Sequence, residues 1–150
     1  MIARLTNPLA ELYDADETAW LEAMSAHIRG GRLAELDLPH LAEYLDDMAR
    51  RDRREVKSRL VSLIAHILKW TRQPDQRSGS WRRTIIAQRQ ELGDLLESGT
   101  LRNHAEAILA EAYTAAVEQA AAETDLPAPS FPAECPWTLE LLLAPEVPGQ

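Results

Sequence analysis

The residues most suited to chemistry lie near the middle of the chain, where a loop precedes a predicted helix. If Ser80 caps that helix, the backbone N–H groups of Ser80, Trp81 and Arg82 point out of its N-terminus. Arg77, Arg82 and Arg83 surround these groups in the sequence. Such an arrangement is typical of anion sites. The interpretation that we favour is simpler, with Ser80 as a helix cap and the arginines in solvent.

A second group of polar side chains joins two predicted helices. By the 100° rotation per residue, Arg59 and His66 flank the apolar face of one helix, whereas Lys69 is expected to point away from the core. Gln88 falls on the apolar side of the next helix, and a buried amide without partners costs about 1–3 kcal/mol. We therefore expect Arg59 or His66 to bond it. The candidate anion- or partner-binding residues are Arg59, His66, Arg77, Ser80, Arg82, Arg83, Gln88 and Arg89.

Charge is strongly segregated along the chain, which carries 16 basic and 24 acidic side chains and a net charge of −8. Residues 50–89 hold twelve basic against three acidic side chains, or +9, and the remainder holds four against 21, or −17. We favour pairing of the basic residues with acidic neighbours on the bundle surface. The alternative is an anionic partner such as nucleic acid, but the overall acidity repels a polyanion, and the region lacks interleaved aromatics for base stacking.

Other reactive side chains form no recognised constellation. The nearest approach to the Glu-x-x-His pairs of di-metal helical bundles is Asp37-x-x-His40. Phosphate-binding and nucleophile motifs are missing from the sequence. The one cysteine, Cys135, excludes an internal disulfide, and we expect it to be a small buried side chain. We expect no catalytic residue, no metal and no cofactor.

The elements that must position these residues are predicted to be helices, because no alternating strand pattern occurs. Asp16 and Asp37 are expected N-caps, and Leu38, Leu41, Leu45 and Met48 form one apolar stripe. The charged run at 50–54 favours a break near Asp52, and hence two helices rather than one long helix. The predicted helices cover about residues 16–29, 38–71 with that break, 81–97, 101–123 and 138–143.

These elements predict an all-α fold, a single-domain four- to five-helix bundle with an extended C-terminal strap. The strap is expected because six of the nine prolines follow residue 126. Trp20, Trp70 and Trp81 lie in or beside apolar stripes and are expected to anchor the core. No apolar run approaches the ~18 residues of a membrane helix, and residues 1–8 lack the apolar core of a signal peptide. We therefore expect a cytoplasmic protein.

The chain also resembles the bacterial domain-of-unknown-function family 29 over nearly its whole length. Its most specific motifs are His66-x-x-Lys69-Trp70-x-x-Gln73-Pro74 and Ser80-Trp81-x-x-Thr84-Ile85-x-x-Gln88-Arg89. Further matches include Leu12-Tyr13-x-x-Asp16-x-x-x-Trp20 and Phe131-Pro132-x-x-Cys135-Pro136. The resemblance implies an all-helical fold and a bacterial cytoplasmic setting, and it implies no activity.

Together these observations predict a non-enzymatic module that binds another protein through its surface. The alternative is anion or nucleic-acid binding through the basic region 50–89. The sequence identifies neither the partner nor the oligomeric state.

Overall fold

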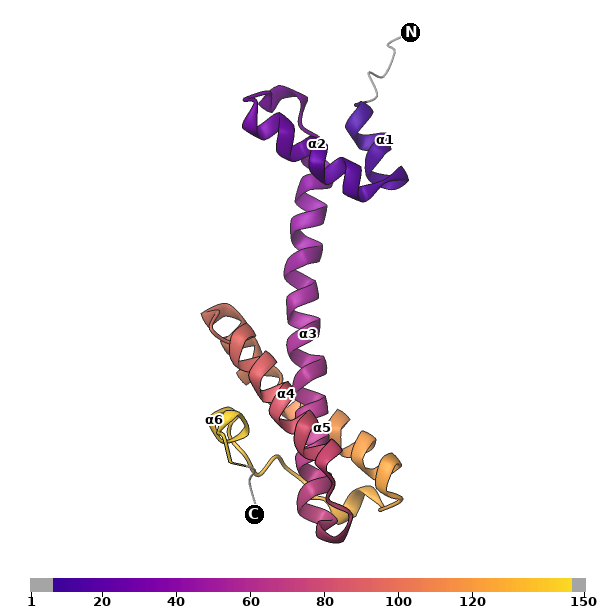
Figure 1. Ribbon diagram of the computed structural model, residues 1–150, viewed down its shortest axis with the longest axis vertical. Coiled ribbons are helices and arrows are strands. Elements are labelled where there is room, and N and C mark those ends of the chain that lie inside the picture. The colour runs from indigo at the N-terminus through magenta and orange to yellow at the C-terminus, as the bar shows by residue number, and fades with distance from the viewer. Residues whose placement is uncertain (1–6, 147–150) are drawn as a thin grey trace. The chain divides into compact units, whose positions relative to one another are not determined.

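The computed structural model describes residues 7–146, and all its regular elements in that range are helical. The predicted all-α fold is confirmed (Figure 1). The helices fall into two compact units, an N-terminal unit that ends at Arg50 and a C-terminal unit that begins at Arg51. The α-helices are α1 (Pro8–Ala15), α2 (Glu17–Arg29), α3 (Leu38–Arg72), α4 (Gly79–Leu95), α5 (Gly99–Thr124) and α6 (Leu139–Leu143). None of these described helices is both long and apolar enough to cross a membrane.

The N-terminal unit begins with two helices that share a capping residue. The backbone N–H of Asp16 bonds Leu12 O at 2.8 Å at the end of α1, and its carboxylate accepts the Ala19 N–H at 3.0 Å in the first turn of α2. The predicted N-cap and the predicted end of α2 before Gly30 are confirmed. Helix α1, which Asn7 caps, was not predicted. Residues 1–6, which belong to the segment predicted to lack a signal peptide, lie outside the described residues.

Helix α3 is one continuous helix, so the predicted break near Asp52 is wrong. The charged run contains neither glycine nor proline, and arginine is a good helix former. Ion pairs along the helix also support this stretch, Asp47 with Arg50 at 3.0 Å and Glu55 with Arg59 at 2.9 Å. A run of charges places side chains in water without interrupting the backbone.

The core of the N-terminal unit is built around Trp20, which is fully buried. Its indole N–H donates to Asp37 Oδ2 at 3.1 Å, and His40 Nδ1 lies 2.6 Å from the same oxygen. Tyr13 stacks on the His40 ring with centroids 4.3 Å apart. Asp37 directly precedes α3 as predicted and its carbonyl accepts the Leu41 N–H at 3.0 Å, while its carboxylate bonds these two rings. Leu9 and Met24 complete the buried cluster.

Helices α3 and α5 run parallel in the C-terminal unit. Lys57 of α3 bonds Glu111 of α5, and these residues are 54 positions apart. Lys69 bonds Glu123, and these residues are also 54 positions apart. The sequence separation is the same at two contacts that lie twelve residues apart on each helix. The two helices must therefore run in the same direction, with a constant register between them.

Helix α4 runs antiparallel to α3, since Arg59 bonds Gln88 while the later Lys69 lies over the earlier Trp81. The unit is therefore an up-down-up bundle of the second part of α3 with α4 and α5. Trp70 is buried there and Trp81 is half-buried. Fully buried core side chains come from all three helices and include Leu60, Leu63, Ile64, Ile67, Ile85, Leu92, Ala105, Ala112, Ala116 and Ala120.

The chain after α5 is attached to the bundle at separate points. Phe131, Leu139 and Leu142 are buried in the core, and the Tyr113 hydroxyl donates to Pro132 O at 2.6 Å. Helix α6, capped by Thr138, lies where it was predicted. The region between α5 and α6 contains one 3-10 turn, and the extended strap stays a prediction. Residues 147–150, the end of the predicted strap, lie outside the described residues.

Replacing Asp37 tests the buried polar cluster of the N-terminal unit. Asp37→Ala leaves the buried Trp20 N–H without its acceptor, and we expect a loss of about 1–3 kcal/mol in the free energy of unfolding. Urea denaturation followed by tryptophan fluorescence measures it. Asp46→Ala, at an exposed position on the same helix, should change stability by less than about 0.5 kcal/mol. Equal effects of the two variants would contradict a structural role for the carboxylate.

Candidate functional site

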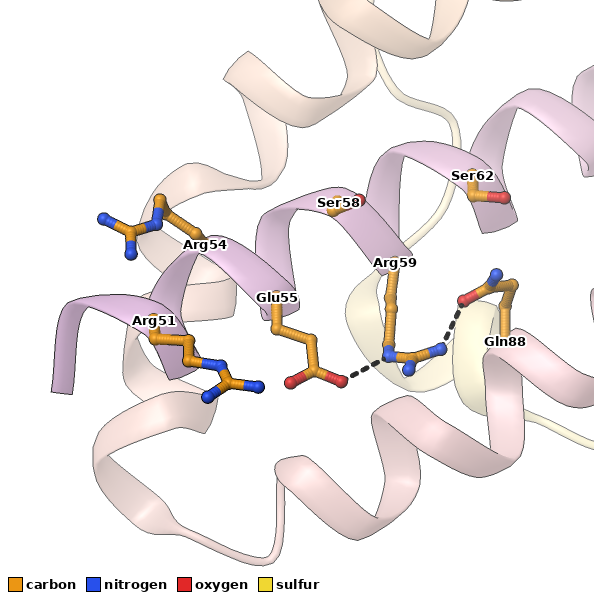
Figure 2. A pocket seen from close by; sticks show the side chains of 7 residues that line it. All are labelled: Arg51, Arg54, Glu55, Ser58, Arg59, Ser62 and Gln88. Atoms are coloured by element: carbon orange, nitrogen blue, oxygen red, sulfur yellow. Dashed lines mark hydrogen bonds and ion pairs between the residues drawn. The ribbon is translucent and has the colours of Figure 1, made fainter. Parts of the chain in front are cut away.

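The structure brings together two of the predicted site residues, Arg59 and Gln88. Arg59 Nη1 donates to Gln88 Oε1 at 3.2 Å, and Arg59 Nε donates to Glu55 at 2.9 Å (Figure 2). Glu91 adds a third contact, 3.7 Å from Arg59 Nη2. The expectation that Arg59 or His66 bonds Gln88 is confirmed for Arg59. The guanidinium is held by an amide and two carboxylates, so each of its three nitrogens has a polar partner.

A polar cleft of about 520 Å³ surrounds this contact. Arg51 and Arg54, both exposed, contribute positive charge, and Ser58 and Ser62 contribute hydroxyl groups. Figure 2 shows Arg54 pointing away from Gln88 and the Glu55 carboxylate lying between Arg51 and Arg59. The cleft therefore offers donors to an anion, but it also presents a negative group.

Lys69 is a structural residue, and the prediction that it points away from the core is wrong. It is 6% exposed, its amine donates to Glu123 at 2.7 Å, and it lies 5.0 Å from the centre of the Trp81 ring. The hydrogen bond from Lys69 lowers the pKa of Glu123 below its ordinary value, although burial opposes the shift. The charged pair and the cation–π contact join α3 to both α5 and α4.

His66 lies on the same helix with one ring nitrogen already used. Its Nδ1–H donates to the Ser62 carbonyl at 2.8 Å, which leaves the lone pair on Nε2. Burial lowers the pKa of His66 below its ordinary value, Lys69 adds to this shift, and the bond to Ser62 opposes it. Burial therefore favours the neutral form of the ring. His66 and Gln88 are not bonded to each other.

The loop before α4 differs from the predicted anion site. Ser78, not Ser80, caps α4, because its hydroxyl accepts the Trp81 N–H at 3.2 Å. Its carbonyl accepts the Arg82 N–H at 3.2 Å. Two of the three N–H groups expected to face a ligand are thus already bonded, and Ser80 lies in the first turn. The helix begins earlier because a serine two residues upstream supplies the same cap chemistry.

The arginines of this region divide into two kinds. Arg77 donates to the Trp70 carbonyl at 2.9 Å and lies 4.7 Å from the Trp70 ring centre, so it caps the end of α3. Arg89 is buried and donates to the carbonyls of Leu142 at 3.1 Å and Pro145 at 3.3 Å. Burial lowers the pKa of Arg89, and one of its terminal nitrogens, Nη2, has no partner among the described residues. Arg82 and Arg83 are exposed.

A second, apolar groove lies in the N-terminal unit, and the sequence interpretation did not anticipate it. It has a volume of about 450 Å³ between α2 and the first part of α3. The stripe of Leu38, Leu41, Leu45 and Met48 indicated an apolar face on this helix. Helical spacing alone does not show whether such a face is covered or open. Its lining residues are Trp20, Leu21, Met24, Ser25, Ile28, Arg29, Leu41, Tyr44 and Leu45.

Large apolar side chains are exposed around this groove. Ile28 is 48% exposed and Leu45 is 58% exposed. Five of the seven exposed large hydrophobic residues found in the described chain belong to the N-terminal unit, namely Ile28, Leu33, Leu38, Leu45 and Met48.

Comparison with known families gives one match, to the family described as domain of unknown function DUF29, over residues 12–147. The chain belongs to the DUF29 family. No curated protein and no solved structure matches it significantly. Several residues of the DUF29-like motifs make contacts that hold the C-terminal unit together. Lys69 bonds Glu123, Arg89 bonds the Leu142 carbonyl, and the Trp70 carbonyl accepts from Arg77.

The remaining reactive groups of this DUF29 protein are dispersed. Within residues 7–146, no three His, Cys, Asp or Glu side chains gather where they could hold a metal ion. Cys135 is half-buried, its thiol lies 3.3 Å from the Trp137 carbonyl, and burial raises its pKa. A protonated thiol is a weak nucleophile.

The contribution of Lys69 can be measured against a matched pair on the same two helices. Lys69→Ala should lower the free energy of unfolding by about 1–3 kcal/mol, because it removes a buried charge partner and the contact with Trp81. Lys57→Ala breaks the equivalent but exposed pair with Glu111 and should cost at most about 1 kcal/mol. Urea denaturation followed by circular dichroism compares them. A loss for Lys57→Ala as large as that for Lys69→Ala would contradict this assignment.

His66 should make stability depend on pH. Its pKa is lower in the folded than in the unfolded chain, so the unfolded state binds the proton more readily, and its contribution to stability falls as the pH drops below about 6.5. We expect His66→Gln to lose less stability than the wild type between pH 7 and pH 5, measured by urea denaturation. His104→Gln is the control for loss of a histidine elsewhere in the unit. Parallel pH profiles for wild type and His66→Gln would refute the prediction.

Proposed function

We propose that this protein is a non-enzymatic module that binds another protein through its N-terminal unit. The observation that carries the proposal is the apolar groove between α2 and the first part of α3, where the lining residues Ile28 and Leu45 are 48% and 58% exposed. Exposed apolar surface that borders a groove is typical of protein-binding sites, whereas single exposed residues are common on any protein. Docking a partner would remove Ile28 and Leu45 from water.

The way in which the reactive side chains are used supports binding rather than catalysis. The Lys69 amine is engaged by Glu123, and the Arg77 guanidinium by the Trp70 carbonyl. A catalytic acid, base or nucleophile needs a free group that faces a substrate. These groups instead hold helices of the C-terminal unit in place.

Anion or nucleic-acid binding through residues 50–89 is the second candidate. Exposed Arg51 and Arg54 beside the polar cleft support it, as do exposed Arg82 and Arg83. We rank it second because Lys57, Arg59 and Lys69 pair with carboxylates. Arg77 and Arg89 bond backbone carbonyls.

We further propose that the chain acts as one domain in the cytoplasm. The family match extends through both compact units, and α3 contributes residues to each of them, which supports one domain. The single cysteine, which leaves no internal disulfide, supports a reducing compartment.

Capture experiments with matched variants test the proposed function. We would crosslink the full-length tagged protein in cells that produce it naturally, then compare wild type with Leu45→Asp and Leu141→Asp. Leu141 is a leucine of the C-terminal unit with similar exposure, 51% against 58%. Because burying a leucine contributes about 1.5–3 kcal/mol, Leu45→Asp should reduce recovery of the partner at least about tenfold. Leu141→Asp should not reduce it.

Two results would contradict this assignment. Equal recovery of the captured proteins by both variants would show that the groove is not involved. Suppose instead that wild type captures nucleic acid, that Arg51→Glu/Arg54→Glu does not, and that Leu45→Asp changes the recovery of no protein. This result would favour the second candidate. Circular dichroism of each variant confirms that it is folded.

A further inference from the structure

We propose that the groove between α2 and the first part of α3 binds a basic amphipathic helix from a different protein. This inference rests on the proposed function and adds the chemistry of the partner. It follows from the presence of an open apolar groove on a strongly acidic unit.

The groove has the form and size of a helix-binding site. Trp20 and Met24 are buried between its two helices, and Leu21 and Ile28 line it along α2. Leu41 and Leu45 line it from α3. The stretch from Leu21 to Ile28 rises about 10 Å, or two helical turns. A helix that presents apolar side chains at i, i+3 or i+4, and i+7 would place them along this length.

The charge around the groove favours a basic partner. Residues 1–50 contain ten acidic and four basic side chains, a formal charge of −6. On α2, the exposed Glu17 lies one turn before Leu21 on the same face. On α3, the exposed Asp46 directly follows Leu45.

Among the described residues that line the groove, Arg29 is the one with a charged side chain. It is the last residue of α2, so it lies at the end of the groove, and its Nε is 3.4 Å from Ser25 Oγ. Lysine or arginine residues beside the apolar positions of the partner would meet the negative charge of the unit, to which Glu17 and Asp46 contribute next to lining residues. Arg29 would face the end of the bound helix.

The same charge argues against the other occupants of an apolar face. A second copy docked face to face would bring together two units that each carry −6. Anionic lipid surfaces and nucleic acids would meet the same repulsion. A basic helix gains attraction from the field as well as burial of its apolar side chains, so it is the occupant that the charge favours.

Model peptides separate the apolar from the electrostatic requirement. The probes are three fluorescein-labelled peptides of equal length. The first has leucines at helical a and d positions with lysines beside them, the second has the same leucines with glutamates, and the third has the lysine composition in scrambled order. Fluorescence anisotropy measures their binding to the full-length protein. A groove variant, Ile28→Gln/Leu45→Gln, is compared with a control variant, Ile86→Gln/Leu141→Gln, whose residues are 43% and 51% exposed.

We expect the amphipathic lysine peptide to bind wild type and the control variant with affinities within about twofold of each other, and the groove variant at least about tenfold more weakly. We expect the glutamate and scrambled peptides to bind wild type at least about tenfold more weakly than the lysine peptide. The neutral substitutions leave the charge of the unit unchanged, so a loss in the groove variant reports apolar contacts.

Each contrary outcome identifies what has failed. If the glutamate peptide binds as well as the lysine peptide and is lost in the groove variant, the basic chemistry is wrong while the docking groove stands. If no peptide distinguishes the groove variant from the control, the docking groove itself is refuted, and the proposed function loses its site. If sedimentation of wild type shows a dimer that the groove variant abolishes, a second copy occupies the groove and the inference is overturned.

Discussion

The buried amine of Lys69 is the contact on which the arrangement of the C-terminal unit depends. An ammonium group removed from water must have partners, because leaving it alone in the core costs several kcal/mol. Lys69 finds them on two different helices, Glu123 of α5 at 2.7 Å and the Trp81 ring of α4 at 5.0 Å. Apolar packing alone would permit α5 to slide along α3. The Lys69–Glu123 pair and the Lys57–Glu111 pair, twelve residues earlier on both helices, together select one register of α5 against α3.

The need to pair buried charges also explains part of the basic segment 50–89. Residues 50–89 carry a local charge of +9, which in isolation suggests a surface for an anion. In the folded unit, Lys57, Arg59 and Lys69 contact carboxylates, and Arg77 and Arg89 bond the carbonyls at the ends of α3 and α6. Part of the charge segregation along the chain therefore becomes contact between helices. Arginines of the segment that remain exposed include Arg51, Arg53, Arg54, Arg72, Arg82 and Arg83.

Periodicity predicted the helices and most of the core, because burial repeats with the rotation of each helix. It also placed Gln88 where Arg59 could reach it, and this contact exists. It failed where the deciding partner lies far away in the sequence. The phase of α3 alone directs Lys69 outward, but Glu123, 54 residues later, draws it inward. Asp37 has the position of a helix cap, and only folding brings the Trp20 indole N–H, 17 residues earlier, to its carboxylate. The short helix α1 contributes Leu9 to the Trp20 cluster, and eight residues carry too little periodic signal to reveal it.

The stripe of Leu38, Leu41, Leu45 and Met48 was expected to face a core, and the described fold covers it incompletely. Leu38 and Leu45 are more than half exposed, although their spacing is that of a buried helix face. Among the described residues of the N-terminal unit, the buried apolar cluster consists of Leu9, Trp20 and Met24, so part of the apolar surface of α2 and of the first part of α3 stays in contact with water. A helical apolar stripe lowers the free energy only when something covers it. Since the acidic surface disfavours a second copy of the unit, a basic amphipathic helix satisfies both the apolar pattern and the charge.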